Sequence, residues 1–439
     1  GISSLSGVAA ARQRGIRVLV TDHHLPGREL PQADAIVNPN QPGDSFPSKN
    51  LAGVGVAFYL LMALRGRLRD SGWFEHGERK EPNLADYLDL VALGTVADLV
   101  PLDHNNRVLV QQGLQRIRAG RCRPGIQALL EVAGRKASRL VAADFGFAVG
   151  PRLNAAGRLD DMSLGIECLL STDRARARQL AEQLDALNRE RREIEADMKT
   201  QALEHVQQLH FDTEQLPMGL CLYSADWHQG VIGILASRIK ERFHRPVIAF
   251  APSAPGEIKG SARSIPGLHI RDTLDAIAAR HPQVLQKFGG HAMAAGLSLA
   301  ESQLPLFEAA FREELKHRLD EEALTGVLES DGALDSADFC LELAELLRSA
   351  GPWGQGFPEP LFDGCFTVVS QRVVGEHHLK LSVRADGGRQ ALDAIAFNQA
   401  AEHQLQKGQR VRLAYRLDSN EYRGLLGLQL MVEMIEVFK

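Results

Sequence analysis

The chain has 439 residues, of which 44% are apolar, and its net charge is −5. This length predicts about three domains, and the apolar fraction is that of an ordinary soluble globular protein. We expect neither a membrane-spanning segment nor a signal peptide, because no apolar run is long enough to span a bilayer and no charged-then-apolar pattern opens the chain. The negative charge excludes nucleic-acid binding through bulk charge, so any such binding needs a local basic groove.

The cysteines do not form a recognisable framework. The five are scattered, and no two of them have CxxC spacing: Cys122, Cys168, Cys221, Cys340 and Cys365. This distribution argues against a disulfide scaffold or a structural zinc site and suits a cytoplasmic protein.

The chain opens in the middle of a pattern. It starts at Gly1 without a Met, and the segment from Gly7 to Arg14 predicts a short helix that ends at Gly15. The strand predicted at Ile16–Val20 completes the second half of a β-α-β unit whose first strand is not in the chain. We therefore expect a fragment that lacks roughly the first hundred residues, from the usual size of a domain.

An acid and two imidazoles, Asp22, His23 and His24, follow directly after this strand. The Val and Leu residues before them predict a fully buried parallel strand. Functional residues of open α/β sheets collect at the carboxyl ends of such strands. Adjacent His side chains diverge, so one of them can face a metal while the other faces a substrate. A strand end with surface histidines is the alternative interpretation.

The segment after His24 is rich in Pro, Asn and Gly and predicts an exposed loop, which contains Asn38-Pro39-Asn40. The run Leu51–Ala57 then opens a helix to about Arg69, and its small residues favour tight packing near the site. A Gly-rich phosphate loop is the alternative, but the glycine spacing fits neither nucleotide-binding fingerprint.

A second acid, Asp98, lies within an otherwise apolar run from Leu93 to Leu102, after an amphipathic helix that we expect from Asp86 to Leu93. A carboxylate there has to be paired, hydrogen-bonded or metal-bound, because burying it alone is costly. A helix N-cap is the alternative role for Asp98. Another helix is expected at Asn106–Ile117.

The block from Gly150 to Leu159 holds Arg152, Asn154 and Arg158 together with two glycines, Gly150 and Gly157. Arg presents a fork of donors to phosphate oxygens, and Gly lets the backbone approach closely, so the block favours contact with a phosphate chain. A glycine-rich helix junction with solvated arginines is the alternative.

From Asp173 to about Leu209 the sequence predicts one long helix with a solvated face of mixed charges, which we interpret as an interdomain connector. A second α/β unit follows. It carries an exposed-looking Trp227 and His228 at a strand-turn-helix junction, then a strand at Pro246–Phe250 and a helix at Ile270–Ala279. Ser261 and Arg263 lie in a Gly-Ser-Ala-Arg-Ser block, and His291 follows Gly289-Gly290.

The last part of the chain changes to short alternating strands after a rigid, aromatic linker at Gly351–Pro360. Five strands are predicted: Phe366–Val369, His378–Arg384, Gln390–Ala396, Gln409–Leu417 and Gly427–Val437. This pattern suggests an OB-type barrel that binds single strands, with a small β-sandwich as the alternative. Its few aromatics, Phe366, Phe397, Tyr415 and Tyr422, would give modest base stacking.

Together these motifs resemble the DHH phosphoesterase superfamily, which is named after the triplet at Asp22-His23-His24. Within it the chain is similar, from its first residue to its last, to the RecJ family of bacterial single-strand-specific 5′→3′ exonucleases. The blocks around Ser261 and Arg263 and around His291 resemble the DHHA1 domain. The resemblance implies an α/β fold with a partial DHH domain at 1–172, a connector helix at 173–210, a DHHA1 domain at 211–325, and a linker with an OB-type β-barrel at 326–439.

The resemblance also implies site roles. His23 and Asp98 would be ligands of a two-metal site holding Mn²⁺ or Mg²⁺, and Asp22 would be a ligand or would orient the His pair. His24 would contact the scissile phosphate. Ser261 and Arg263 would hold the 5′-terminal phosphate, while Trp227, His228 and His291 would touch the strand. Further metal-binding acids of the family would lie upstream, so the site is incomplete and we expect the fragment to bind metal weakly and to be inactive.

The activity implied is hydrolysis of single-stranded DNA from its 5′ end to mononucleotides, in DNA repair and recombination. Implied partners are a single-strand-binding protein and a RecQ-type helicase, with a monomer in the cytoplasm and no membrane contact. Two other functions stay open: a DHH phosphodiesterase of oligonucleotides or cyclic dinucleotides, and a non-catalytic single-strand-binding scaffold. The intact His23, His24 and Asp98 argue against the scaffold.

Overall fold

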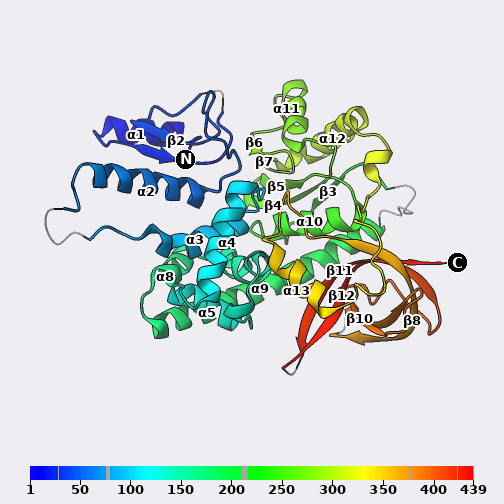
Figure 1. Cartoon of the computed structure of the whole chain (residues 1–439). Helices are drawn as coiled ribbons and strands as arrows, with labels where there is room; N and C mark the ends of the chain where they lie inside the picture. The colour runs from blue at the N-terminus through cyan, green and yellow to red at the C-terminus, as the bar shows by residue number, and fades with distance from the viewer. Residues whose placement is uncertain (28, 76–79, 209–215, 376, 423, 439) are drawn as a thin grey trace. The chain divides into compact units, whose positions relative to one another are not determined.

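The computed structural model describes residues 1–439 except 28, 76–79, 209–215, 376, 423 and 439. The chain, drawn from blue to red in Figure 1, divides into two compact units by its internal contacts. The first comprises Gly1–Pro151, Cys168–Arg178 and Glu329–Lys439, and the second comprises Arg152–Glu167 and Gln179–Leu328. No helix among the described residues is both long and apolar enough to cross a membrane.

The first unit opens with helix α1 (Leu5–Gln13) and strand β1 (Leu19–Thr21), which pairs in parallel with β2 (Ala35–Val37). Helix α2 (Gly53–Asp70) follows and confirms the helix predicted from Leu51 to about Arg69. The prediction of a fully buried strand is wrong: Val20 is buried, but Leu19 is 55% exposed. Among the described residues β1 pairs only with β2, and this narrow sheet leaves the Leu19 face uncovered.

Helices then build the core of the first unit. They are α3 (Leu88–Ala97), α4 (His104–Arg118), α5 (Pro124–Val132) and α6 (Ala142–Asp144), followed by a π-helical turn at Phe145–Val149. Helix α4 begins before the predicted Asn106, because the Asp103 side chain accepts a hydrogen bond from the Asn106 amide and caps it. Gly113 lets α4 approach α3 closely, since a Cβ atom there would lie 2.3 Å from the Leu88 carbonyl oxygen.

The second unit contains most of the long helix α9 (Arg174–Gln208) and a five-stranded sheet with its own helices. Helices α7 (Gly150–Leu159) and α8 (Ser163–Leu170) precede α9. The five-stranded sheet has the order β3-β4-β5-β7-β6, with β3 and β4 parallel and the other pairs antiparallel. Its strands are β3 (Leu220–Tyr223), β4 (Val247–Ala254), β5 (Glu257–Arg263), β6 (Lys287–Gly290) and β7 (Ala294–Ala300). This part of the chain also contains the helices α10 (Ile232–Phe243), α11 (Ile270–Arg280) and α12 (Leu304–Arg318). Phe250, Phe307 and Phe311 are buried in one of its hydrophobic cores.

The predicted C-terminal barrel is confirmed. Helix α13 (Leu341–Ala350) leads to five strands that close in the order β10-β12-β11-β8-β9 (orange to red in Figure 1). The strands are β8 (Phe362–Val374), β9 (His378–Ala385), β10 (Leu392–Ala396), β11 (Arg410–Tyr422) and β12 (Leu425–Val437). All are longer than predicted except β10, which begins two residues later than the predicted Gln390. The α/β class with a terminal OB barrel is therefore the fold of this chain.

The aromatic linker is packed against the N-terminal helices of the first unit. The Leu102 amide donates to the Gln355 carbonyl at 2.6 Å, and the Arg107 guanidinium lies 4.0 Å from the centre of the Phe357 ring. The Trp353 ring stacks on Phe357 with 5.0 Å between centroids. These contacts explain why the barrel and the N-terminal helices form one compact unit, although the sequence alone separates them. The predicted domain limits stay a prediction.

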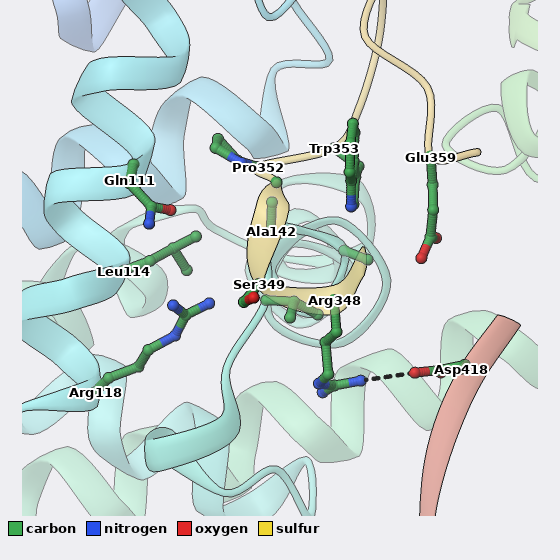
Figure 2. A pocket seen from close by; sticks show the side chains of 13 residues that line it. Gln111, Leu114, Arg118, Ala142, Arg348, Ser349, Pro352, Trp353, Glu359 and Asp418 are labelled. Carbon is green, nitrogen blue, oxygen red and sulfur yellow. Dashed lines mark hydrogen bonds and ion pairs between the residues drawn. The ribbon is translucent and has the colours of Figure 1, made fainter. Parts of the chain in front are cut away.

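A cavity of about 100 Å³ lies where the linker, α4 and the barrel meet (Figure 2). Arg118, Arg348 and Glu359 are among its lining residues, and Arg348 pairs with Asp418 of β11 at 3.2 Å. Arg118 donates to the Leu140 carbonyl at 2.8 Å. The cavity therefore places charged groups at the junction between the linker and the barrel.

Candidate active site

Asp22 is the anchor of the His pair. Its backbone amide donates to the Val37 carbonyl at 3.1 Å, which extends the β1–β2 pairing by one residue. Its Oδ1 atom accepts from the backbone amides of His23 at 2.7 Å and His24 at 2.9 Å, and Oδ2 accepts from the Ile2 amide at 2.5 Å. The side chain is only 10% exposed, so these backbone amides hold the carboxylate in place.

The Asp22 carboxylate also fixes the imidazole of His24. Nδ1 of His24 lies 2.7 Å from Oδ1 of Asp22, and because a carboxylate only accepts, Nδ1 carries the proton. Burial raises the pKa of Asp22, but the hydrogen bonds from His24, Ile2 and His23 outweigh it and hold the pKa of that carboxyl well below its usual range. Asp22 therefore stays ionised, and Nε2 of His24 is the ring nitrogen that could face a substrate.

His23 meets the second acid. Its Nε2 atom lies 3.2 Å from Oδ2 of Asp98, with the His23 side chain 17% exposed and the Asp98 side chain 43% exposed. Asp98 is the C-cap of α3, so the alternative N-cap role is wrong. The expectation of a buried carboxylate is also wrong, because α3 ends at Ala97 and the chain turns outward through Leu99, which has a φ of 58°. Asp98 is in contact with His23, and its role as a metal ligand stays a prediction.

The donor set fits part of a divalent-cation site. One ligand atom from each of Asp22, His23 and His24 lies within 4.8 Å of the others. Asp98 lies beside this group because its carboxylate contacts the His23 ring. Carboxylate and imidazole donors suit Mn²⁺, and Mg²⁺ takes carboxylate oxygens. His23 and Asp98 could hold the ion directly. Both oxygens of Asp22 already accept hydrogen bonds, which favours the orienting role for Asp22 over the ligand role.

Two residues that the sequence left without a role lie against this pair. The side-chain amides of Asn38 and Asn40 donate to the carbonyl oxygens of His24 and His23. Both follow β2 just as the acid and the His pair follow β1. Their position after a neighbouring parallel strand is the signal that could have placed them here.

In the second unit, Arg263 and Ser261 lie together as expected. Arg263 donates from Nη1 to the Ser261 hydroxyl at 3.0 Å and from Nε to the Ser237 hydroxyl at 3.1 Å. Gly233, in the first turn of α10, makes room for them: a Cβ atom there would lie 2.9 Å from Nη2 of Arg263. The N-terminal turn of a helix favours anions, so this cluster suits a phosphate group.

Arg158 adds to the same cluster. Its Nη1 atom donates to the Gly230 carbonyl at 3.0 Å. Burial lowers the pKa of Arg263, and the nearby charge of Arg158 lowers it further. Burial also lowers the pKa of Arg158, with a further contribution from Arg191. Guanidinium groups that repel one another in a partly buried place are stabilised by an anion between them.

The remaining predicted contacts divide into exposed and buried residues. His228 and His291 are exposed; Nδ1 of His228 accepts from the Gly230 amide, and the His291 amide donates to the Ala294 carbonyl. Asn154 is exposed on α7. These three positions are compatible with contact to a strand, and their roles stay predictions.

Trp227 and Arg152 are placed differently from the prediction. Trp227 is 5% exposed in an apolar core, and its indole N–H donates to Gln201 at 2.8 Å, so the expectation of an exposed ring is wrong. A large apolar ring gains more from burial than from solvent, provided that its N–H finds an acceptor. Arg152 is 8% exposed and pairs with Asp185 of α9 at 2.9 Å, which ties α7 to α9 rather than offering a donor to DNA.

The aromatic residues of the barrel are mostly core. Tyr415 and Phe366 are at most 1% exposed, whereas Phe397 is 47% exposed and packs edge-on against His378. The side chain of Tyr422 lies outside the described residues. Among the described side chains of this set, Phe397 is the one exposed enough to stack on a base.

Three known domain families match successive parts of the chain. A model described as the DHH family, N-terminal domain, matches residues 1–95; the DHHA1 domain model matches 217–317; and the RecJ OB domain model matches 330–434. The solved structure of RecJ from Thermus thermophilus in complex with Mn²⁺ is similar, with 29% identity and a TM-score of 0.77 over 100% of this chain and 61% of that one. A RecJ exonuclease bound to manganese has 33% identity and a TM-score of 0.56 over 73% of this chain and 74% of that one.

The curated relatives cover nearly the whole chain. It is 60% identical to the single-stranded-DNA-specific exonuclease RecJ of Dickeya dadantii and 59% identical to that of Escherichia coli, in both cases over 99% of this chain. The match spans 75% of the first relative and 76% of the second. The RecJ of Bacillus subtilis is 34% identical over 99% of this chain and 52% of its own length. The chain therefore belongs to the RecJ family, whose members are single-stranded-DNA-specific exonucleases.

Proposed function

We propose that this chain provides the site at which a metal-dependent exonuclease hydrolyses single-stranded DNA from its 5′ end and releases mononucleotides. The observation that carries the proposal is the meeting of His23 with Asp98, beside a His24 ring that Asp22 holds in one orientation. Relatives solved with Mn²⁺ and with Mg²⁺ support the use of a divalent ion by this family.

Each residue has a distinct task in this proposal. His23 and Asp98 would hold the ion, which when bound lowers the pKa of a water and stabilises the leaving oxygen. Nε2 of His24 would contact the scissile phosphate, and Asp22 would keep that ring in its tautomer. In the second unit Arg263, Ser261 and Arg158 would bind the 5′-terminal phosphate. Arg gives paired, directional contacts to phosphate oxygens.

The wider setting follows from the family and is also proposed. We expect action in DNA repair and recombination, in the cytoplasm, as a monomer, with a single-strand-binding protein and a RecQ-type helicase as partners.

The test is the degradation of 5′-phosphorylated single-stranded DNA in Mn²⁺, followed with a label at the 3′ end and, separately, at the 5′ end. The proposal predicts immediate release of 5′-labelled mononucleotide and late loss of the 3′ label, with a matched duplex left intact. Cleavage restricted to dinucleotides or cyclic dinucleotides would favour the phosphodiesterase alternative. Binding of the strand without cleavage, by the protein at the length of its relatives, would favour the scaffold.

A further inference from the structure

The turn after β2 reaches across to the backbone of the His pair. Nδ2 of Asn38 donates to the His24 carbonyl at 2.9 Å, and Nδ2 of Asn40 donates to the His23 carbonyl at 2.6 Å. The regular β1–β2 pairing ends at Thr21 and Val37. These two side-chain bonds therefore continue the connection between the two strand ends where the backbone pairing has stopped.

The orientation of the Asn38 amide is determined by its surroundings. Its Oδ1 atom accepts from the Asn40 backbone amide at 2.8 Å, so its NH₂ group must point to the His24 carbonyl. The side chain is only 2% exposed. A buried amide that has lost its acceptor costs free energy, so Asn38 and the His24 carbonyl hold each other in place.

The turn itself is fixed from its other side. Nζ of Lys49 donates to the Pro39 carbonyl at 2.6 Å and to the Asp44 carbonyl at 2.8 Å. The second donor direction of the Asn40 amide reaches the Lys49 carbonyl at 3.1 Å. Lys49 therefore holds the turn that carries both asparagines in place.

We infer that Asn38 and Asn40 are positioning residues, which clamp the peptide groups of His23 and His24 so that His23 meets Asp98 and His24 keeps its orientation. The inference rests on the metal-dependent hydrolysis proposed above and deepens it. Asp22 holds the pair from the amide side, and the two asparagines hold it from the carbonyl side. Outer partners of this kind set metal affinity because they fix the ligand's geometry.

Isosteric changes remove the two side-chain donors one at a time. Asn38→Asp keeps the oxygen that accepts from the Asn40 amide but loses the donor to the His24 carbonyl. Asn40→Asp loses the donor to the His23 carbonyl together with the donor to the Lys49 carbonyl, so its melting temperature shows how far the turn is also loosened. Gln41→Glu is the matched control, because Gln41 donates to the Ile36 and Asn38 carbonyls in the same turn and touches neither His carbonyl.

Each variant is measured for its Mn²⁺ affinity, its melting temperature without metal, and its kcat and KM on 5′-phosphorylated single strands. The protein used has the same length as the curated relatives. Both Asn variants should bind Mn²⁺ about 10- to 100-fold more weakly than Gln41→Glu, with a matching fall in kcat and little change in KM. An added carboxylate by itself attracts cations, so weaker Mn²⁺ binding would report displacement of the His pair.

Mn²⁺ affinity and kcat equal to those of Gln41→Glu would overturn the inference. If Asn38→Asp melts well below the control, the decision rests on Asn40→Asp, because Asn40 is only partly buried. If the unmutated protein neither binds Mn²⁺ nor cuts, the proposed function fails and this inference falls with it. If the unmutated protein binds Mn²⁺ and cuts, but both Asn variants behave like Gln41→Glu, the positioning role of the asparagines is contradicted while the proposed function stands.

Discussion

Nε2 of His23 lies 3.2 Å from Oδ2 of Asp98, which brings the end of strand β1 to the end of helix α3. An imidazole and a carboxylate at this distance can share a divalent cation in place of their direct contact. The other acid of the site, Asp22, is already held by hydrogen bonds and keeps the neighbouring ring of His24 in place. The two acids therefore have different tasks although both are adjacent to a histidine.

The 5′-phosphate role of the second unit is tested with Arg263→Lys. The charge stays, but the fork that contacts the Ser261 and Ser237 hydroxyls is lost. The preference for 5′-phosphorylated over 5′-hydroxyl strands, measured as the ratio of kcat/KM, should fall roughly 10- to 100-fold, from the usual strength of a hydrogen bond to a charged group. Arg238→Lys, at an arginine that pairs with Glu195 and Glu241, is the control. An unchanged ratio in Arg263→Lys would place the phosphate elsewhere.

Arg152 should matter for stability and not for DNA. Arg152→Gln removes one arginine partner of Asp185 while Arg189 remains, and it should cost up to about 3 kcal/mol of unfolding free energy, the lower end for a broken buried pair. Arg189→Gln removes the exposed partner of the same carboxylate and should cost less than about 1 kcal/mol. Urea unfolding gives these values, and fluorescence anisotropy gives the affinity for a labelled single strand. A loss of DNA affinity in Arg152→Gln at unchanged stability would restore the phosphate-contact role.

Because of Glu359, a residue of the linker, we expect the stability of the folded protein to depend on pH. Burial raises the pKa of Glu359 above its ordinary value of 4.5. The folded protein then holds this proton more tightly than the unfolded chain, so its contribution to stability is lost as pH rises from about 4.5 through the raised value. Glu359→Gln should therefore raise the melting temperature relative to the parent, by an amount that grows from pH 4.5 toward neutrality. Glu402→Gln, at an exposed position, should give a flat difference. A difference that shrinks with rising pH would contradict the assignment.

Much of the site was predictable because its residue types are distinctive in their positions. The positions of Asp22, His23 and His24 after an apolar strand, and of Asp98 in an apolar run, mark these residues as candidates, and the resemblance to the RecJ family supplies their expected metal roles. The five-strand pattern likewise predicts the barrel. Residue type does not tell which face of an element is covered, and for that reason Leu19 and Trp227 were predicted with the wrong exposure.

Hydrogen-bond partners were harder to predict than elements. Arg152 and Arg158 lie in one helix and one sequence block. Arg152 nevertheless forms an ion pair with Asp185, whereas Arg158 donates a hydrogen bond to the Gly230 carbonyl. The roles of Asn38 and Asn40 depend on where an amide group points, which the sequence leaves open. Such assignments need the register of β1 against β2, which places the turn beside the His pair.

The most direct test of the account is Mn²⁺-dependent release of mononucleotides from 5′-phosphorylated single-stranded DNA, compared between the parent protein at the length of its relatives and its His23→Ala and Asp98→Ala variants. His104→Ala, at an exposed histidine of the same unit, is the control. The account predicts that both site variants lose Mn²⁺ affinity and at least about 100-fold in kcat, the upper range for disturbing a metal site, while the control retains both. Cleavage by His23→Ala at the rate of the parent would contradict the assignment of His23 and Asp98 as the metal-holding pair.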